Sequence, residues 1–216
     1  MATGSSAASA PAGRGRPRLI PARRRGETAR EEILDAAAEL FTRHGYTGTS
    51  TRMIAEAVGI RQASMYHYFG TKDDILATLL ETTVDASLGH ARRLLDDPGP
   101  ALPRLLELAR FDVDQLARSR WNLGALYLLP EVGDQRFVEF RTARQELAGA
   151  YASLAAAALD DETDKRTLLP FRLVESVIMM RADEQRGELG DHGAVGLADT
   201  VVGAIEMLIE HRPHRG

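Results

Sequence analysis

The sequence predicts an all-α protein, and three observations lead to that prediction. Apolar residues recur at helical spacing through most of the chain. No segment alternates between apolar and polar residues with a period of two over a useful length, and β-branched residues are sparse. Breaks rich in Pro, Gly and Asp separate the helical stretches. We therefore expect about nine helices, with ends uncertain by about 2–4 residues.

Four of these helices are expected between Thr28 and about Leu80. Thr28 and Glu31 have the spacing of a capping box, so the first helix should begin at Thr28. The second is short and ends at Gly59, and the third covers 62–69. Beyond the fourth, helical patterns cover 101–119, 121–129, 135–159, 166–186 and 194–211.

Charge divides the chain into a basic front and an acidic rear. The net charge is −4, but residues 1–72 carry +5 and residues 73–216 carry −9. Only the front should therefore meet a polyanion. We expect a disordered basic arm over 1–26, a DNA-binding domain over 27–72 and a helical sensing and dimerisation domain over 73–216.

Several classes of protein are disfavoured by what the sequence lacks. There is no cysteine, which excludes disulfides, thiolate metal sites and cysteine nucleophiles. We find no metal motif, no cofactor motif and no local catalytic arrangement, which argues against an enzyme. Residues 1–12 lack an apolar signal core, and the most apolar stretch, 148–159, is too short to span a bilayer. We therefore expect a cytoplasmic protein without a membrane partner.

The third predicted helix has the chemistry of a DNA-recognition helix. Gln62 stands first and can pair with an adenine edge, and Ala63 is small enough to contact a thymine methyl group. Met65 and Phe69 are expected to pack this helix onto its neighbours, and His67 should be solvated. Hydrogen-bonding side chains at the start of such a helix can reach base edges in the major groove.

A wider pattern strengthens this interpretation. Residues 46–60 and 64–76 closely resemble the N-terminal domain of the tetracycline-repressor (TetR) family, including its Tyr-x-x-Phe-x-x-Lys signature at Tyr66, Phe69 and Lys72. The resemblance implies that Arg52 reaches a base or a phosphate. It also implies phosphate contacts by Ser50, Thr51, Ser64, Tyr66, Tyr68 and Lys72.

Arg61 departs from the family pattern, which usually has a small hydroxyl cap at this position. The helix should therefore lose a cap, at a cost of about 1 kcal/mol. Whether Arg61 offsets this cost by contacting a phosphate or a base in the DNA complex stays open. Further upstream, residues 13–18 resemble an AT-hook core, in which Arg14 and Arg16 would enter a narrow minor groove. The alternative is a passive, solvated tail.

The last two predicted helices carry more apolar residues than one face needs. One face can pack on the body and another on a second copy. The family resemblance implies a two-fold dimer through a four-helix bundle made from these helices. Symmetry then predicts a near-palindromic operator read in successive major grooves.

Several large aromatic residues and two carboxylates occur in the rear helices, and they predict a small-molecule pocket. Members of the family that this sequence resembles typically hold such a pocket there. The candidate ligand-binding residues are Phe111, Asp112, Trp121, Tyr127, Phe140, Tyr151, Phe171, Glu175 and Met179. Asp112 and Glu175 interrupt apolar stripes, so each must pair with an Arg or face the pocket. Arg172 and Arg141 are the candidate partners. For each residue the alternative is an ordinary place in the core.

Taken together, the sequence predicts a ligand-responsive transcriptional regulator. It would act as a repressor that binds double-stranded DNA as a homodimer and is released by a small apolar or aromatic effector. The effector would prefer a body conformation that moves the fourth helix and changes the separation of the two reading heads. The alternative is an architectural protein that prefers A·T-rich DNA and has no effector.

Overall fold

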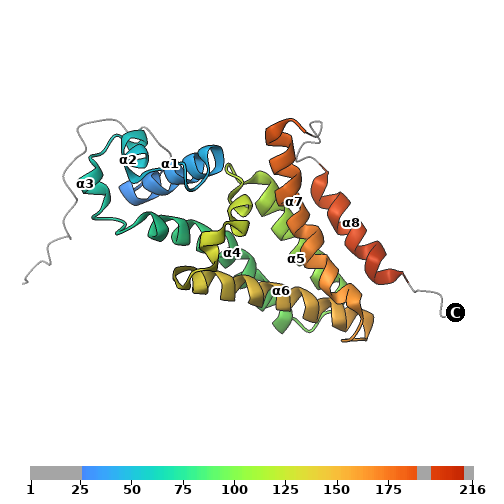
Figure 1. The fold of residues 1–216 in the computed structure, drawn as a ribbon. Coiled ribbons are helices and arrows are strands. Elements are labelled where there is room, and N and C mark those ends of the chain that lie inside the picture. The colour runs from blue at the N-terminus through green and yellow to red at the C-terminus, as the bar shows by residue number, and fades with distance from the viewer. Residues whose placement is uncertain (1–25, 189–195, 212–216) are drawn as a thin grey trace, which may run out of the picture.

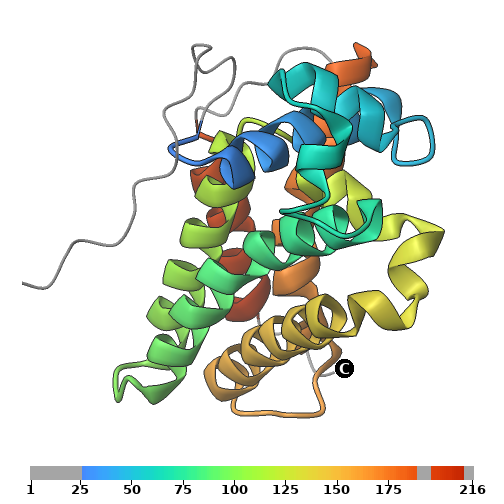
Figure 2. The same ribbon diagram turned by 90° about the vertical axis from the view of Figure 1, so that its left-hand side faces the viewer.

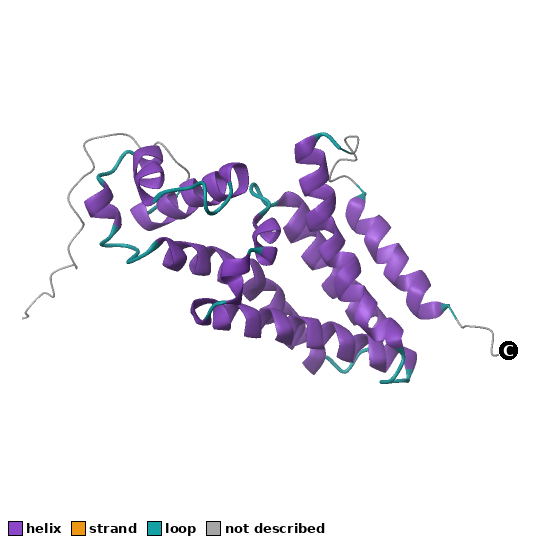
Figure 3. Ribbon diagram, viewed as in Figure 1, coloured by secondary structure: helices purple, strands orange, loops and turns teal. Residues whose placement is uncertain are grey.

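The computed structural model describes residues 26–188 and 196–211. Within them, eight α-helices and four short 3-10 helices make up the regular structure (Figures 1 and 3). The α-helices are α1 Ala29–His44, α2 Thr51–Val58, α3 Gln62–Met65, α4 Lys72–Asp96, α5 Ala101–Arg118, α6 Val138–Leu159, α7 Leu169–Arg186 and α8 Leu197–Glu210. The 3-10 helices are η1 Leu123–Leu128, η2 Pro130–Gly133, η3 Gln135–Phe137 and η4 Lys165–Leu168.

The all-α prediction is confirmed, and the differences lie in how single helices begin and end. The helix expected over 121–129 is the 3-10 helix η1. Gly124 in η1 packs so closely on α7 that a Cβ there would lie 2.5 Å from Ile178 Cδ1. The helix expected over 62–69 ends as an α-helix at Met65 and continues as a turn.

Helix starts follow the sequence signals. Thr28 and Glu31 form the expected capping box at α1, and Thr71 and Asp74 form a second at α4. The helix expected over 166–186 begins as an α-helix only at Leu169, after the 3-10 helix η4. Pro170 then lies in the first turn of α7, where its missing N–H is not needed.

The helices form two groups that share α4 (Figures 1 and 2). The group α1–α3 lies at one end of the molecule, and α5–α8 form the body. The first half of α4 contributes Leu76 and Leu80 to the core around α1–α3, and its second half contributes Leu88 and Ala91 to the core of the body. Since α4 belongs to both cores, the domain boundary placed after Lys72 stays a prediction.

The core of the α1–α3 group also extends into the segment between α5 and α6. Met65 and Phe69 are buried in it, as expected, together with Leu126, Val132 and Phe137 from that segment. The segment 121–137 is therefore packed against the α1–α3 group as well as against the body. No helix in the described part of the chain is long and apolar enough to cross a membrane.

Candidate functional site

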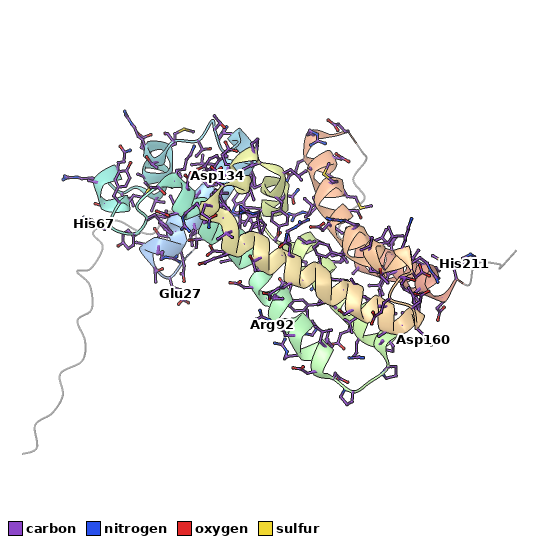
Figure 4. All side chains as sticks on the ribbon, turned by 60° about the horizontal axis from the view of Figure 1, so that its bottom comes forward. Glu27, His67, Arg92, Asp134, Asp160 and His211 are labelled. Carbon is purple, nitrogen blue, oxygen red and sulfur yellow. The ribbon has the colours of Figure 1, made fainter. Side chains whose placement is uncertain are left out.

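An exposed polar surface covers α2 and α3 at the outer end of the molecule. Gln62 Nε2 donates a hydrogen bond of 2.9 Å to Thr51 Oγ1, which lies 3.4 Å from the Tyr66 hydroxyl. His67 projects at this end, far from His211 at the other (Figure 4). The side chains of Thr51, Gln62 and Tyr66 thus hold each other in place across the two helices.

Arg52 and Glu56 form an ion pair on the outer face of α2. The Arg52 Nε to Glu56 Oε1 distance is 2.8 Å, and 77% of the Arg52 side chain is exposed. Exposed pairs of this kind add little stability, because water competes for both charges. Arg52 can therefore leave Glu56 for a DNA phosphate or base at small cost.

Lys72 fixes the loop between α1 and α2. Its Nζ donates to the carbonyl oxygens of Tyr46 at 2.8 Å and Thr49 at 3.0 Å, and it lies 4.0 Å from the centre of the Tyr46 ring. Tyr46 in turn donates from its hydroxyl to Asp73, and burial, reinforced by this carboxylate, raises the pKa of that phenol. The ammonium group therefore positions the start of α2.

Two further candidate residues, Ser50 and Arg61, stand at the N-cap positions of α2 and α3. Ser50 Oγ accepts the Met53 N–H and so caps α2, while its own hydroxyl proton stays available for a phosphate. Arg61 stands at the cap position of α3 and makes no side-chain cap. The loss of the cap that the sequence indicated is confirmed, and the Arg61 side chain is exposed.

The body contains a cavity of about 210 Å³. Its apolar wall includes Val84, Leu116, Leu147, Val174 and Ile178, and side chains reach it from α4, α5, η1, α6 and α7. The polar and aromatic lining residues are Thr82, Thr83, Ser87, Asp112, Gln115, Ser119, Trp121, Asn122, Tyr127, Arg144, Phe171 and Glu175.

Asp112 is the most deeply buried charged residue of this lining, with 4% of the residue exposed. Its Oδ2 accepts a hydrogen bond of 2.8 Å from the Tyr151 hydroxyl, and its Oδ1 is buried without a hydrogen-bond partner. Burial raises the pKa of the carboxyl to about 6, although the Ser87 and Tyr151 hydroxyls act in the opposite direction. The carboxylate is therefore held in an unfavourable place.

Glu175, the other acid in the lining, is fully paired. Arg144 donates to its Oε1 and Arg172 to its Oε2, the latter at 2.6 Å. The Arg144 guanidinium also lies 5.6 Å from the centre of the Tyr127 ring and 5.4 Å from that of Phe171. Of the two predicted Arg partners, Arg172 is confirmed for Glu175. Arg141 was the wrong partner, because it donates to the carbonyl oxygens of Val132 and Asp134.

Direct contacts join the cavity to the α1–α3 group. Trp121 lines the cavity, and its Nε1 donates a hydrogen bond of 3.1 Å to Asp35 on α1. Arg120 bonds to the same carboxylate at 3.2 Å and lies 4.6 Å from the centre of the Trp121 ring. Nearby, Arg136 pairs with Asp74 in the first turn of α4 at 2.8 Å. A change in cavity shape therefore has a short route to α1 and α4.

Known proteins resemble this chain over both groups of helices. Residues 33–79 match the family described as "Bacterial regulatory proteins, tetR family". The crystal structure of AmtR from Mycobacterium smegmatis is 52% identical and superposes with a TM-score of 0.77, covering 89% of this chain and 92% of that one. The chain belongs to the tetR family.

Two further proteins are similar at lower identity or over less of the sequence. The transcriptional repressor KstR2 of Mycobacterium tuberculosis (strain H37Rv) is 34% identical over 85 residues, which are 38% of this chain and 42% of that protein. The match thus spans about two fifths of the curated relatives' length. A crystal structure of AibR in complex with isovaleryl coenzyme A and operator DNA has the same fold, with a TM-score of 0.64, 18% identity, and coverage of 82% of this chain and 97% of that one.

Five of the nine predicted ligand-binding residues line the cavity of this tetR-family chain: Asp112, Trp121, Tyr127, Phe171 and Glu175. The other four do not. The Phe111 ring packs on His90, with the ring centres 4.6 Å apart, and the Phe140 ring packs on Tyr127, with the ring centres 5.0 Å apart. Tyr151 touches the cavity only through Asp112, and Met179 is exposed on α7.

Sequence reasoning missed Arg144, Gln115 and Asn122 in the lining. Arg144 and Gln115 look like ordinary surface residues of amphipathic helices, and Asn122 lies in an irregular segment where its burial could not be foreseen. Asn122 Nδ2 donates to the Ile178 carbonyl oxygen at 2.9 Å, which ties η1 to α7.

The predicted DNA-binding residues within the described chain belong to α2, α3, the residues that cap these helices, the turn after α3 and the first residue of α4. Figure 1 shows α2 and α3 together at one end of the molecule. Arg52, Arg61, Gln62, Ala63, Tyr66 and Tyr68 are exposed. Ser64 is partly exposed, and Lys72 is partly exposed but already bonded to backbone carbonyls. Arg14 and Arg16 lie outside the described residues, so the arm stays a prediction.

Proposed function

We propose that this protein is a ligand-responsive, DNA-binding transcriptional regulator that acts as a repressor. The observation that carries the proposal is the hydrogen bond between Trp121, a wall of the cavity, and Asp35, on the first helix of the DNA-binding unit. It gives a ligand in the body a physical contact through which to move the surface that meets DNA.

DNA would be held by the polar surface on α2 and α3. Gln62 and Ala63 stand at the exposed start of α3, where base edges come within reach. Ser50, Thr51, Tyr66 and Tyr68 would hold phosphates around them, and Arg52 would exchange Glu56 for the DNA. Such contacts position the protein, while Gln62 and Ala63 supply the sequence preference.

Regulation would be a shift between two populations of the body. A ligand in the cavity would favour the arrangement of α4 and the 121–137 segment that fits it best. Because α4 is shared by both cores, this shift would re-orient the DNA-binding unit. A ligand with equal affinity for the two arrangements would have no effect.

A homodimer through α7 and α8 would complete the operator-binding unit. Both helices expose large apolar side chains, with Met207 70% exposed and Met179 51% exposed. Leu168, Leu169 and Met180 add to this exposed apolar surface at and within α7. An apolar surface of this kind favours a second copy.

The first experiment is selection of duplexes from a random DNA library by the purified protein at physiological salt. We expect a near-palindromic site with half-sites about one helical turn apart. Enrichment of A·T-rich DNA without a palindrome would overturn the proposal in favour of an architectural protein. Repeating the selection with a variant lacking residues 1–25 separates the contribution of the arm from that of α3.

A further inference from the structure

Among the described residues, no donor forms a hydrogen bond to one buried acceptor of the cavity, although the Ser87 hydroxyl lies near enough to lower the pKa of the same carboxyl. Asp112 Oδ1 is buried and receives no hydrogen bond, although Oδ2 of the same carboxylate is bonded to Tyr151. In the described residues no Arg, Lys or His forms an ion pair with Asp112. A buried carboxylate without a donor is unfavourable, so a ligand that brings a donor gains the hydrogen bond and relieves that cost.

Several other polar groups of the lining already have partners within the protein. Glu175 is paired with Arg144 and Arg172. Asn122 donates to the Ile178 carbonyl oxygen, and the Thr83 and Tyr127 hydroxyls bond to each other at 2.6 Å. Within this lining, Asp112 therefore supplies the charge that still lacks an opposite charge.

The cavity limits the size and character of the ligand. Its volume of about 210 Å³ is below the range of roughly 300–1,000 Å³ that drug-sized ligands fill. Leu116, Leu147, Val174 and Ile178 offer an apolar wall, and Phe171 adds an aromatic one. A small molecule with one polar group and a compact hydrocarbon body fits this description.

We infer that the cavity binds a small organic cation, whose protonated nitrogen donates to Asp112 Oδ1 and whose hydrocarbon body packs against the apolar wall. The inference rests on the proposed function, since it names the chemical class of the effector. An amine or an amidine has both the charge and the donors that Asp112 requires. A carboxylate ligand would instead add a second negative charge beside Asp112.

The test is calorimetric titration of the full-length protein with benzylamine, cyclohexylamine and benzamidine as probes. Benzyl alcohol and benzoate serve as neutral and anionic counterparts of similar shape. We expect the cations to bind at least tenfold more tightly than the counterparts, and Asp112→Asn to remove that preference. Asp114→Asn is the matched control, because Asp114 lies on the same helix outside the cavity.

The pH dependence of wild-type binding gives a readout that needs no variant. The titratable and charged groups around the cavity are Asp112 on α5, Arg144 and Tyr151 on α6, Tyr127 on η1 and Glu175 on α7. Cation binding should weaken as pH falls through about 6, where Asp112 takes up a proton. In Asp112→Asn this dependence should disappear.

Two outcomes separate this inference from the proposed function. If benzyl alcohol or benzoate binds as tightly as the cations and Asp112→Asn changes nothing, the inference is overturned, while regulation by another ligand stands. If benzylamine binds through Asp112 but leaves the affinity for the selected DNA unchanged, the ligand class holds and its role as an effector falls.

Discussion

The polar surface on α2 and α3, where we propose that DNA binds, and the cavity both gather polar side chains, but they hold them in opposite ways. On α2 and α3, Thr51, Gln62 and Tyr66 bond to one another in solvent and can exchange those bonds for DNA at little cost. In the body, Asp112 is buried with half of its carboxylate unsatisfied. Bulk water screens the first group, whereas burial removes the second from bulk solvent. Changes to Asp112 should therefore alter stability, and changes to the exposed side chains of α2 and α3 should alter DNA binding alone.

The largest expected effect is stabilisation by Asp112→Asn at neutral pH. Burial raises the pKa of this carboxyl from its ordinary 3.8 to about 6, so the folded state binds the proton more tightly than the unfolded state. The contribution of Asp112 to stability is thus greatest below the ordinary pKa of 3.8 and falls as pH rises to about 6, by about 3 kcal/mol in all. Asn keeps an acceptor for Tyr151 and has no charge to bury.

Urea denaturation at several pH values measures this effect. At pH 7.5 the variant should be more stable than the wild type by up to about 3 kcal/mol, and the difference should vanish as pH approaches 4. Asp114→Asn, on the exposed side of α5, should show no such trend. A variant that is less stable at pH 7.5 would mean that Asp112 has a partner which compensates its burial.

The next effect is on DNA specificity. Gln62→Ala should cost about 1–3 kcal/mol at one base position in each half-site and relax the preference there, with the stability of the fold unchanged. Lys72→Met should weaken binding to all sequences alike and also lower stability, because its ammonium holds the carbonyl oxygens of Tyr46 and Thr49. Binding to a panel of single-base operator variants distinguishes the two profiles. Identical profiles would contradict the division between base and backbone contacts.

A smaller effect is expected from breaking the hydrogen bond between Trp121 at the cavity and Asp35 on α1, which should reduce the coupling between ligand binding and DNA binding. Trp121→Phe keeps a ring in the cavity wall and removes the donor to Asp35. We expect ligand affinity in the absence of DNA to change little, and the factor by which ligand lowers DNA affinity to shrink about fivefold. Asp35→Asn should give the same loss. Weakened ligand binding with intact coupling would place the signal on another route.

The smallest effect is expected at the polar surface on α2 and α3 itself. Glu56→Gln releases Arg52 and removes a negative charge that would face phosphates. DNA affinity should rise by a few-fold, with a steeper dependence on salt, because one more cation is free to displace counterions. Glu107→Gln, an exposed acid on α5, is the matched control. Equal affinities for Glu56→Gln and the wild type would mean that Arg52 does not reach the DNA.

The sequence by itself determined the all-α fold, the capping box at Thr28 and the group of residues that α2 and α3 present to solvent. These features depend on local spacing: helical periodicity, caps and the short, specific pattern from Tyr46 to Leu76. Met65 and Phe69 were correctly placed in the core for the same reason. Five of the residues that line the cavity were also predicted, and two of them, Asp112 and Glu175, were singled out because they interrupt apolar stripes.

Tertiary structure alone decided which of those residues face the cavity and what satisfies them. Phe111 and Asp112 are neighbours on α5, yet one stacks on His90 and the other lines the cavity. Arg144 became the partner of Glu175 because α6 and α7 cross at that point, 31 residues apart in sequence. The bond from Trp121 to Asp35 spans 86 residues. Periodicity gives the face of a helix, but the neighbour across that face is set by packing between distant segments, which local sequence does not encode.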